Sequence, residues 1–153
     1  MGLILPVFVY AAPVNRSLEV SGWIPYWRET LGTENTKPNL GLITTVHPFA
    51  YYVEAGALVD KVGITDEPWS SFLAEARARK VRVIPTVMWN DPVAIHYVLS
   101  DRGRREQLID TIVEVVEEQN FDGIDIDFES KLAETKDHFS AFLRELYREL
   151  GNK

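Results

Sequence analysis

Four acidic residues lie within the segment FDGIDIDFES, which covers residues 121–130. Asp125, Asp127 and Glu129 alternate there with apolar residues, and Asp122 precedes them. Alternate side chains of an extended strand point to the same face, so the last three acids form a ladder with a spacing of about 6.6 Å. Carboxylates that are close together and withdrawn from water share protons and can act as general acids or bases. The segment is therefore the first candidate for a catalytic site.

The rest of the chain determines which face these acids occupy, because in an antiparallel sheet with one wet face the alternation would be ordinary. Strand-like and helix-like patterns alternate along the chain, which indicates βα units and a parallel sheet. Such a sheet is covered on the outside by helices, so Ile124, Ile126 and Phe128 are expected to pack on helices. Asp125, Asp127 and Glu129 then face the interior of a barrel. The expected strands cover 18–27, 42–53, 81–89 and 121–129, and the expected helices cover 67–80, 104–119 and 135–150, with a further short helix after Asp91 and Pro92.

Two segments do not fit the alternation. Residues 28–41, RETLGTENTKPNLG, are polar and contain Gly and Pro, which predicts a loop between the first two strands. Residues 1–17 begin with an apolar run that ends in Ala11 and Ala12, which predicts a secretory signal peptide or its remnant, with an N-terminal strand or a misplaced start as the alternative. The run is shorter than the roughly 20 apolar residues of a membrane span. We therefore expect one folded unit over residues 18–153 and a secreted or cell-envelope location.

Composition argues against several classes of partner and cofactor. The net charge is -7 and no basic patch is visible in the sequence, which argues against nucleic acid or an anionic membrane as a partner. Cysteine is absent, so the chain has neither disulfides nor thiolate metal ligands. His47, His96 and His138 lie in separate segments without metal-ligand spacing. We predict no metal and no other cofactor.

The pattern D-G-x-D-x-D-x-E in DGIDIDFE resembles the signature of family 18 glycoside hydrolases, the chitinase-like enzymes that act on N-acetylglucosamine polymers. The resemblance extends over residues 18–150, because SGWIPYW, HPFAYYV and KVRVIPTVMW are similar to the family's first three strands. It is closer to bacterial cell-wall and spore-cortex relatives than to typical chitinases. The implied fold is α/β, the (β/α)8 TIM barrel, of which this chain would form the first four βα units.

The resemblance also implies roles for the acids in a substrate-assisted retaining mechanism. Glu129 would protonate the glycosidic oxygen, while the substrate's own 2-acetamido carbonyl attacks the anomeric carbon. Asp127 would orient the acetamido nitrogen, and Asp125 would exchange a proton with Asp127. Asp122 and Gly123 would hold the entry to the strand.

Three aromatic residues are candidates for contact with the sugar. Tyr26 and Trp27 follow the first strand and Trp89 ends the third, but core packing is an equally good explanation for each. The third strand ends in PTVMWN, where many chitinases have a serine and two glycines. The sequence therefore leaves open which residues of this strand contact the sugar.

The length of the chain leads to a further expectation. A (β/α)8 barrel takes about 250 residues, whereas this chain has 153 and reaches only the fourth strand and its helix. We therefore expect the N-terminal half of a hydrolase, inactive by itself. Its first and fourth strands would be open sheet edges, through which copies are expected to associate.

Two other functions remain open. A non-catalytic module of the same fold could bind amino-sugar polymers, although such modules usually lack the acid at position 129. An Asp-x-Asp-x-Glu ladder could also hold Mg²⁺, because hard cations prefer oxygen ligands, but no phosphate-binding Gly-rich loop accompanies it. The sequence does not distinguish chitin from peptidoglycan.

Overall fold

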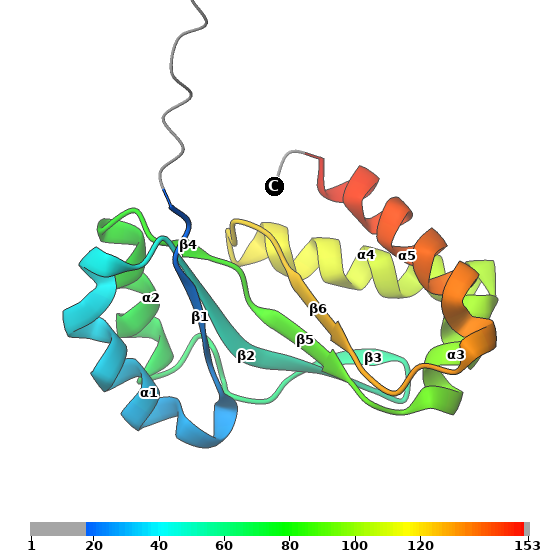
Figure 1. Ribbon diagram of the computed structural model, residues 1–153, viewed down its shortest axis with the longest axis horizontal. Coiled ribbons are helices and arrows are strands. Elements are labelled where there is room, and N and C mark those ends of the chain that lie inside the picture. The colour runs from blue at the N-terminus through cyan, green and yellow to red at the C-terminus, as the bar shows by residue number, and fades with distance from the viewer. Residues whose placement is uncertain (1–17, 152–153) are drawn as a thin grey trace, which may run out of the picture.

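The computed structural model describes residues 18–151, so the signal-peptide prediction for residues 1–17 lies outside the described residues. Four parallel strands form the sheet in the spatial order β1-β2-β5-β6, with β1 and β6 at its edges (Figure 1). The short strand β4 pairs with the start of β2 and precedes β5 at the same sheet position. The bounds are β1 (Ser21–Ile24), β2 (Thr45–Glu54), β3 (Ala57–Asp60), β4 (Arg82–Val83), β5 (Thr86–Trp89) and β6 (Asp125–Phe128).

Helical segments follow or connect the parallel strands, and Figure 1 shows α1 and α2 together, with α3, α4 and α5 grouped towards β6. The arrangement is that of a half barrel, which confirms the fold predicted from the sequence. No helix within residues 18–151 combines the length and the apolar character needed to cross a membrane. The α-helices are α1 (Glu29–Thr36), α2 (Trp69–Ala78), α3 (Pro92–Ser100), α4 (Arg102–Glu118) and α5 (Lys136–Leu150), and the 3-10 helices are η1 (Tyr26–Arg28), η2 (Lys37–Leu42) and η3 (Ala133–Thr135).

One hydrophobic core lies between the sheet and its helices. Side chains of one parity on each strand are buried there, because a covered parallel sheet excludes water from its outer face. The buried strand residues include Ile24, Val46, Val83, Val87 and Phe128, and the buried helix residues include Phe72, Leu108, Ile112 and Phe142.

The predicted loop at residues 28–41 is wrong, because the chain forms η1, α1 and η2 there. This segment shows no apolar stripe, and α1 buries only Thr33. Gly32 explains how so polar a helix packs closely: a Cβ at this position would lie 2.6 Å from Ile24 Cγ2. The glycine that suggested a turn is instead the residue that lets α1 approach β1.

The third strand is divided, because Pro85 has no amide hydrogen to give to the ladder. The break separates β4 from β5, and the carbonyl oxygen of Ile84 lies 3.0 Å from His47 Nδ1. The interruption leaves the parallel pairing of β5 with β2 and β6 in place.

An antiparallel hairpin extends β2 beyond the barrel and was not expected from the sequence. Strand β3 pairs with the end of β2, with Glu54 opposite Ala57. The two connecting residues, Ala55 and Gly56, have φ angles of 50° and 81°. A two-residue turn with two positive φ angles suits the twist of a hairpin. Alanine is an uncommon residue at such a position, so the turn gave little signal in the sequence.

Candidate active site

The acid ladder of β6 faces the interior of the half barrel. Thr86 of β5 is paired with Asp125 and Met88 with Asp127 in the parallel register, and paired residues of neighbouring strands share a face. Phe128 has the opposite parity, and its ring stacks on Phe142 of α5 with a centroid distance of 5.4 Å. The strand therefore divides apolar side chains from acidic ones as the alternation indicated.

Asp125 is anchored by two hydrogen bonds to the same oxygen. Trp23 Nε1 donates to Asp125 Oδ2 at 2.9 Å, and Thr86 Oγ1 donates to it at 2.8 Å. Trp23 comes from β1, at the other edge of the sheet, so its side chain reaches across the concave face. These two donors fix the orientation of the carboxylate next to Asp127.

Asp127 holds its proton more tightly than an ordinary aspartate. Burial raises the pKa of its carboxyl group, and the negative charges of Glu129 and Asp125 raise it further. The ammonium group of Lys131 acts in the opposite direction on this pKa. A carboxyl group with a raised pKa between two other acids is suited to donate a hydrogen bond or pass on a proton.

Glu129 stands at the carboxyl end of the sheet, where barrel active sites are built. Its backbone N–H donates to Trp89 O at 2.7 Å, which continues the ladder one residue beyond β6. Its side chain is exposed. Ser130 then turns the chain with a φ of 53°, and the Lys131 ammonium donates to the carbonyl oxygen of Phe128. The turn leaves the Glu129 carboxyl group accessible to a ligand.

Aromatic side chains lie at the same end of the sheet. Tyr26 and Trp27 follow β1 and are 43% and 65% exposed. Their rings form an edge-to-face pair with centroids 4.9 Å apart, and the Trp27 ring lies 6.5 Å from that of Phe49. The two residues thus extend the concave face beyond the end of β1.

Trp89 does not join this group. It is 2% exposed, and its ring packs edge-to-face on Phe128 with a centroid distance of 5.3 Å. Because Trp89 is paired with Phe128 in the register, its side chain points to the helix-covered face of the sheet. The sequence-based expectation of a sugar contact at Trp89 therefore needs correction, and we leave this residue out of the site.

The sequence matches the family "Glycosyl hydrolases family 18" over residues 23–153. The chain belongs to this family. Comparison with curated proteins finds no match. Several solved structures share the fold of this family 18 chain, at sequence identities too low to indicate more than the fold.

The spore cortex-lytic enzyme SleL of Bacillus cereus superposes with a TM-score of 0.76 at 18% identity, over 89% of this chain and 33% of its own. A class V chitinase of Pseudomonas fluorescens gives a TM-score of 0.77 at 21% identity, over 90% of this chain and 43% of its own. A family 18 chitinase of Cycas revoluta in complex with (GlcNAc)4 gives a TM-score of 0.69 at 17% identity, over 84% of this chain and 39% of its own. The family 18 chain thus spans less than half the length of each of these proteins.

Three residues on the inner face of the family 18 chain were not selected from the sequence. Trp23 stacks on His47 with centroids 5.3 Å apart and an angle of 28° between the rings, and Met88 is paired with Asp127. Strand parity could have selected Trp23, because it precedes the core residue Ile24. His47 could not be selected, since one histidine in an apolar strand gives no signal of its own.

Asp122 and Gly123 hold the entry to β6. The backbone N–H of Asp122 donates to Val83 O at 3.0 Å, and its Oδ2 accepts from Val83 N at 2.8 Å. Gly123 is buried and has a φ of 153°, which side chains rarely allow. Both residues therefore fix the backbone conformation at the start of β6, the end of the strand away from Glu129.

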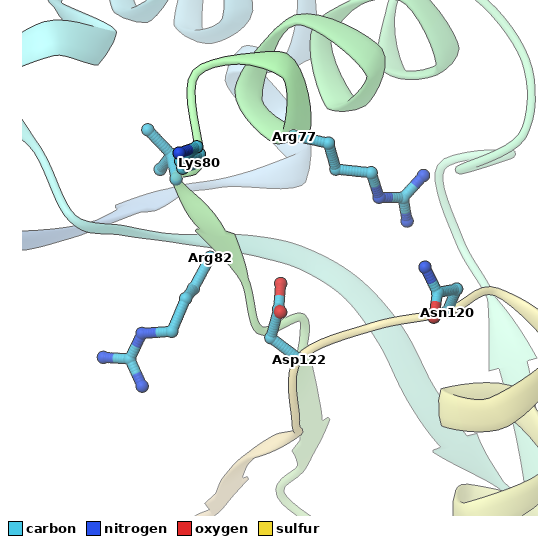
Figure 2. A pocket seen from close by; sticks show the side chains of 6 residues that line it. Arg77, Lys80, Arg82, Asn120 and Asp122 are labelled. Carbon is cyan, nitrogen blue, oxygen red and sulfur yellow. The ribbon is translucent and has the colours of Figure 1, made fainter.

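A basic opening of about 320 Å³ lies beside Asp122. Figure 2 shows Asp122 beside the strand that carries Arg82, with Arg77 and Asn120 on the other side and Lys80 on the turn above. Arg77 Nη2 donates to Gln119 O, the carbonyl group at the C-terminal end of α4, at 2.8 Å. Cations favour helix C-termini, where carbonyl groups lack partners. Arg77 therefore stabilises the C-terminal end of α4, whereas Arg82 forms an ion pair with Glu19.

The two other histidines meet on the outside of the sheet. His96 of α3 and His138 of α5 have ring centroids 5.8 Å apart, and His96 Nδ1 lies 3.0 Å from Thr135 Oγ1. Among residues 18–151, no group of three or more His, Asp or Glu side chains is arranged to hold a metal ion.

Proposed function

We propose that this chain provides the acid-bearing half of a hydrolase that cleaves β-1,4 glycosidic bonds in N-acetylglucosamine-containing polymers. The observation that carries the proposal is the placement of Asp125, Asp127 and Glu129 on one concave face, with Glu129 just beyond the carboxyl end of β6. Membership of family 18 supports it. So does the fold similarity to a chitinase that is described in complex with (GlcNAc)4.

In the proposed reaction Glu129 is the general acid. It gives its proton to the glycosidic oxygen as the bond to the anomeric carbon breaks, and the leaving sugar departs as an alcohol. The carbonyl oxygen of the substrate's 2-acetamido group forms the new bond to the anomeric carbon, which produces an oxazolinium ion. Water then attacks the same carbon and gives its proton to the Glu129 carboxylate, while the bond between that carbon and the acetamido oxygen breaks and restores the 2-acetamido group. Two displacements retain the configuration of the anomeric carbon.

Asp127 orients the acetamido group in this scheme. Its raised pKa keeps a proton in the ladder at a pH where an ordinary aspartate would be ionised. One of its oxygens accepts a hydrogen bond from the acetamido N–H. Its proton moves between Asp125 and Asp127 as the charge on Glu129 changes, and the two donors on Asp125 keep that carboxylate in place.

The aromatic residues at this end of the sheet suit a sugar ligand. Trp23, Tyr26 and Trp27 are all more than two-fifths exposed, and sugar rings present apolar C–H faces that pack on such rings. We infer that these three residues contact the polymer. A polymeric substrate of the chitin or peptidoglycan kind also favours a secreted or cell-envelope location, and the similarity to a spore cortex-lytic enzyme agrees with this.

The experiment joins this chain to the last four βα units of a family 18 neighbour, to complete the barrel. The completed protein is incubated with an N-acetylglucosamine tetramer, and NMR identifies the anomer formed first. We expect cleavage with retention that a chelator does not reduce. Cleavage with inversion would rule out the oxazolinium route, and loss of activity with a chelator would favour the Mg²⁺ alternative.

Two further outcomes separate the remaining alternatives. Binding of the tetramer without cleavage would favour the non-catalytic module. Parallel assays with chitin and peptidoglycan identify the polymer. The 153-residue chain by itself is the control. We expect it to be inactive, because residues 18–151 supply only four of the eight strand positions of a barrel.

A further inference from the structure

We propose that His47 is a positioning residue of the acid ladder: its ring holds the Trp23 indole in the place from which the indole donates to Asp125. Asp125 exchanges a proton with Asp127 in the proposed reaction, so the catalytic role of His47 rests on the proposed function. The contacts themselves can be tested on the chain without any turnover.

His47 supplies a hydrogen bond that the backbone cannot make. The N–H of Ile84 donates to Val46 O at 3.0 Å, and in a regular parallel ladder the carbonyl group of Ile84 would accept from the N–H of residue 48. That residue is Pro48, which has no N–H. His47 Nδ1 lies 3.0 Å from Ile84 O instead. Because a carbonyl oxygen only accepts, Nδ1 carries the proton, and this contact fixes the orientation of the His47 ring.

The fixed ring is a platform for Trp23. The two residues are paired in the parallel register of β1 and β2, so their side chains share the concave face. Their rings stack with centroids 5.3 Å apart and an angle of 28° between the planes. Trp23 is 59% exposed, and an exposed side chain keeps its rotamer freedom unless a neighbour packs on it. The stack on His47 therefore restricts the indole to one orientation.

Trp23 transmits this order to the acid ladder. Its Nε1–H donates to Asp125 Oδ2 at 2.9 Å, and Thr86 Oγ1 donates to the same oxygen at 2.8 Å. Two donors fill both lone pairs of that oxygen, so the proton that Asp125 exchanges with Asp127 uses the other oxygen, Oδ1. Without the platform the indole can turn away, and Thr86 alone does not keep Oδ1 directed at Asp127.

Two substitutions separate the platform from a role in the backbone alone. In His47→Asn the side-chain amide nitrogen takes the place of Nδ1 and can donate to Ile84 O, but the ring is absent. His47→Phe keeps a ring beside Trp23 and loses the donor. If His47 only replaced the missing N–H of Pro48, His47→Asn would match the parent and His47→Phe would not. The platform predicts the opposite order.

The first readout is solvent exchange of the Trp23 indole N–H, measured by nitrogen-15 NMR on the 153-residue chain. Exchange should be about two- to tenfold faster in His47→Asn than in the parent, as expected when one hydrogen bond is lost, and His47→Phe should lie between them. Trp69 is the internal control, because its indole N–H also donates to a carboxylate, that of Glu29, at 3.4 Å. Its exchange should be equal in all three proteins. The control variant His138→Asn, on α5, should leave the Trp23 exchange unchanged.

Turnover in the completed barrel is the second readout. His47→Asn should lower kcat for the tetramer by about tenfold or more, since small misplacements of reacting groups have effects of this size. The same substitution should have no further effect in a Trp23→Phe background, because the indole donor is already absent and both changes act through one contact. Both His47 variants should fold, because His47 is half-buried and lies outside the hydrophobic core, and circular dichroism checks this.

Three results would overturn the role of His47. Indole exchange in His47→Asn equal to that of the parent would mean that His47 serves only the backbone. An equal acceleration at Trp69 would mean that the substitution loosens the whole fold. A full additional loss of kcat in the Trp23→Phe background would mean that His47 does not act through Trp23. If the completed barrel cleaves nothing, the proposed function fails, and the indole exchange still decides whether His47 holds Trp23.

Discussion

Asp127→Asn should stabilise the folded chain at neutral pH and leave its stability unchanged in acid. Asp127 has a raised pKa in the folded state, mainly because of burial and then because of the charges of Glu129 and Asp125. A group of this kind contributes stability below its unfolded pKa of about 3.9 and loses that contribution as the pH rises through the folded pKa. Asparagine has nearly the same shape and never ionises, so the variant does not suffer this loss.

The size of the effect follows from the pKa. Each unit by which the folded pKa exceeds the unfolded one corresponds to about 1.4 kcal/mol, and about 1 kcal/mol shifts the Tm of a chain of this size by roughly 2–4 °C. Thermal unfolding of both proteins gives the difference in Tm between Asp127→Asn and the parent. It is measured between about pH 3 and pH 8, roughly the span in which carboxyl groups titrate. It should be close to zero below the unfolded pKa and should rise to a plateau.

The matched control is Asp110→Asn, on an exposed position of α4. It reports the effect of the same Asp-to-Asn change outside the acid ladder. If Asp127→Asn is less stable than the parent at neutral pH, or if its difference does not change with pH, the carboxylates of β6 do not hold a shared proton.

Three other substitutions test parts of the same region. Trp23→Phe keeps the stack on His47 but removes the 2.9 Å hydrogen bond to Asp125; it should cost about 0.5–1.5 kcal/mol in urea unfolding, whereas Trp27→Phe should cost little. Phe128→Ala leaves a cavity among Trp89, Phe139 and Phe142. It should lower the free energy of unfolding by about 3–5 kcal/mol in the same experiment. A loss near zero would contradict the packing of β6 on α5. Lys131→Met removes the positive charge that lowers the pKa of Asp127, so a carbon-13 NMR titration should find this pKa higher than in the parent. Lys136→Met is the control. An Asp127 titration that is unchanged in Lys131→Met would refute the charge effect.

The face of β6 that carries the acids could be predicted because strand parity is a local property. Asp125, Asp127 and Glu129 alternate strictly with apolar residues, and the flanking helical patterns required the outer face to be apolar. The partners of Asp125 could not be predicted in the same way. Trp23 is 102 positions away in the chain, and only the curvature of the sheet brings its indole group to the carboxylate.

Helix α1 and residue Trp89 show two other limits of sequence patterns. α1 has no apolar stripe, and Gly32 appeared to be a turn residue although its function is to allow close contact with Ile24. Trp89 ends its strand near the proposed site, but the break at Pro85 obscures the parity of the third strand. The register with β6 then assigns Trp89 to the core. In both cases the deciding contact is tertiary.

The central claim is that Glu129 is the general acid of a glycosidase, and turnover of the Glu129→Gln variant tests it most directly. The measurement compares kcat and tetramer binding in the completed barrel with and without this substitution. Because glutamine cannot donate the proton but keeps the shape of the side chain, kcat should fall by about 10²-fold or more while tetramer binding stays within about twofold. Turnover equal to that of the parent would contradict the assignment of Glu129.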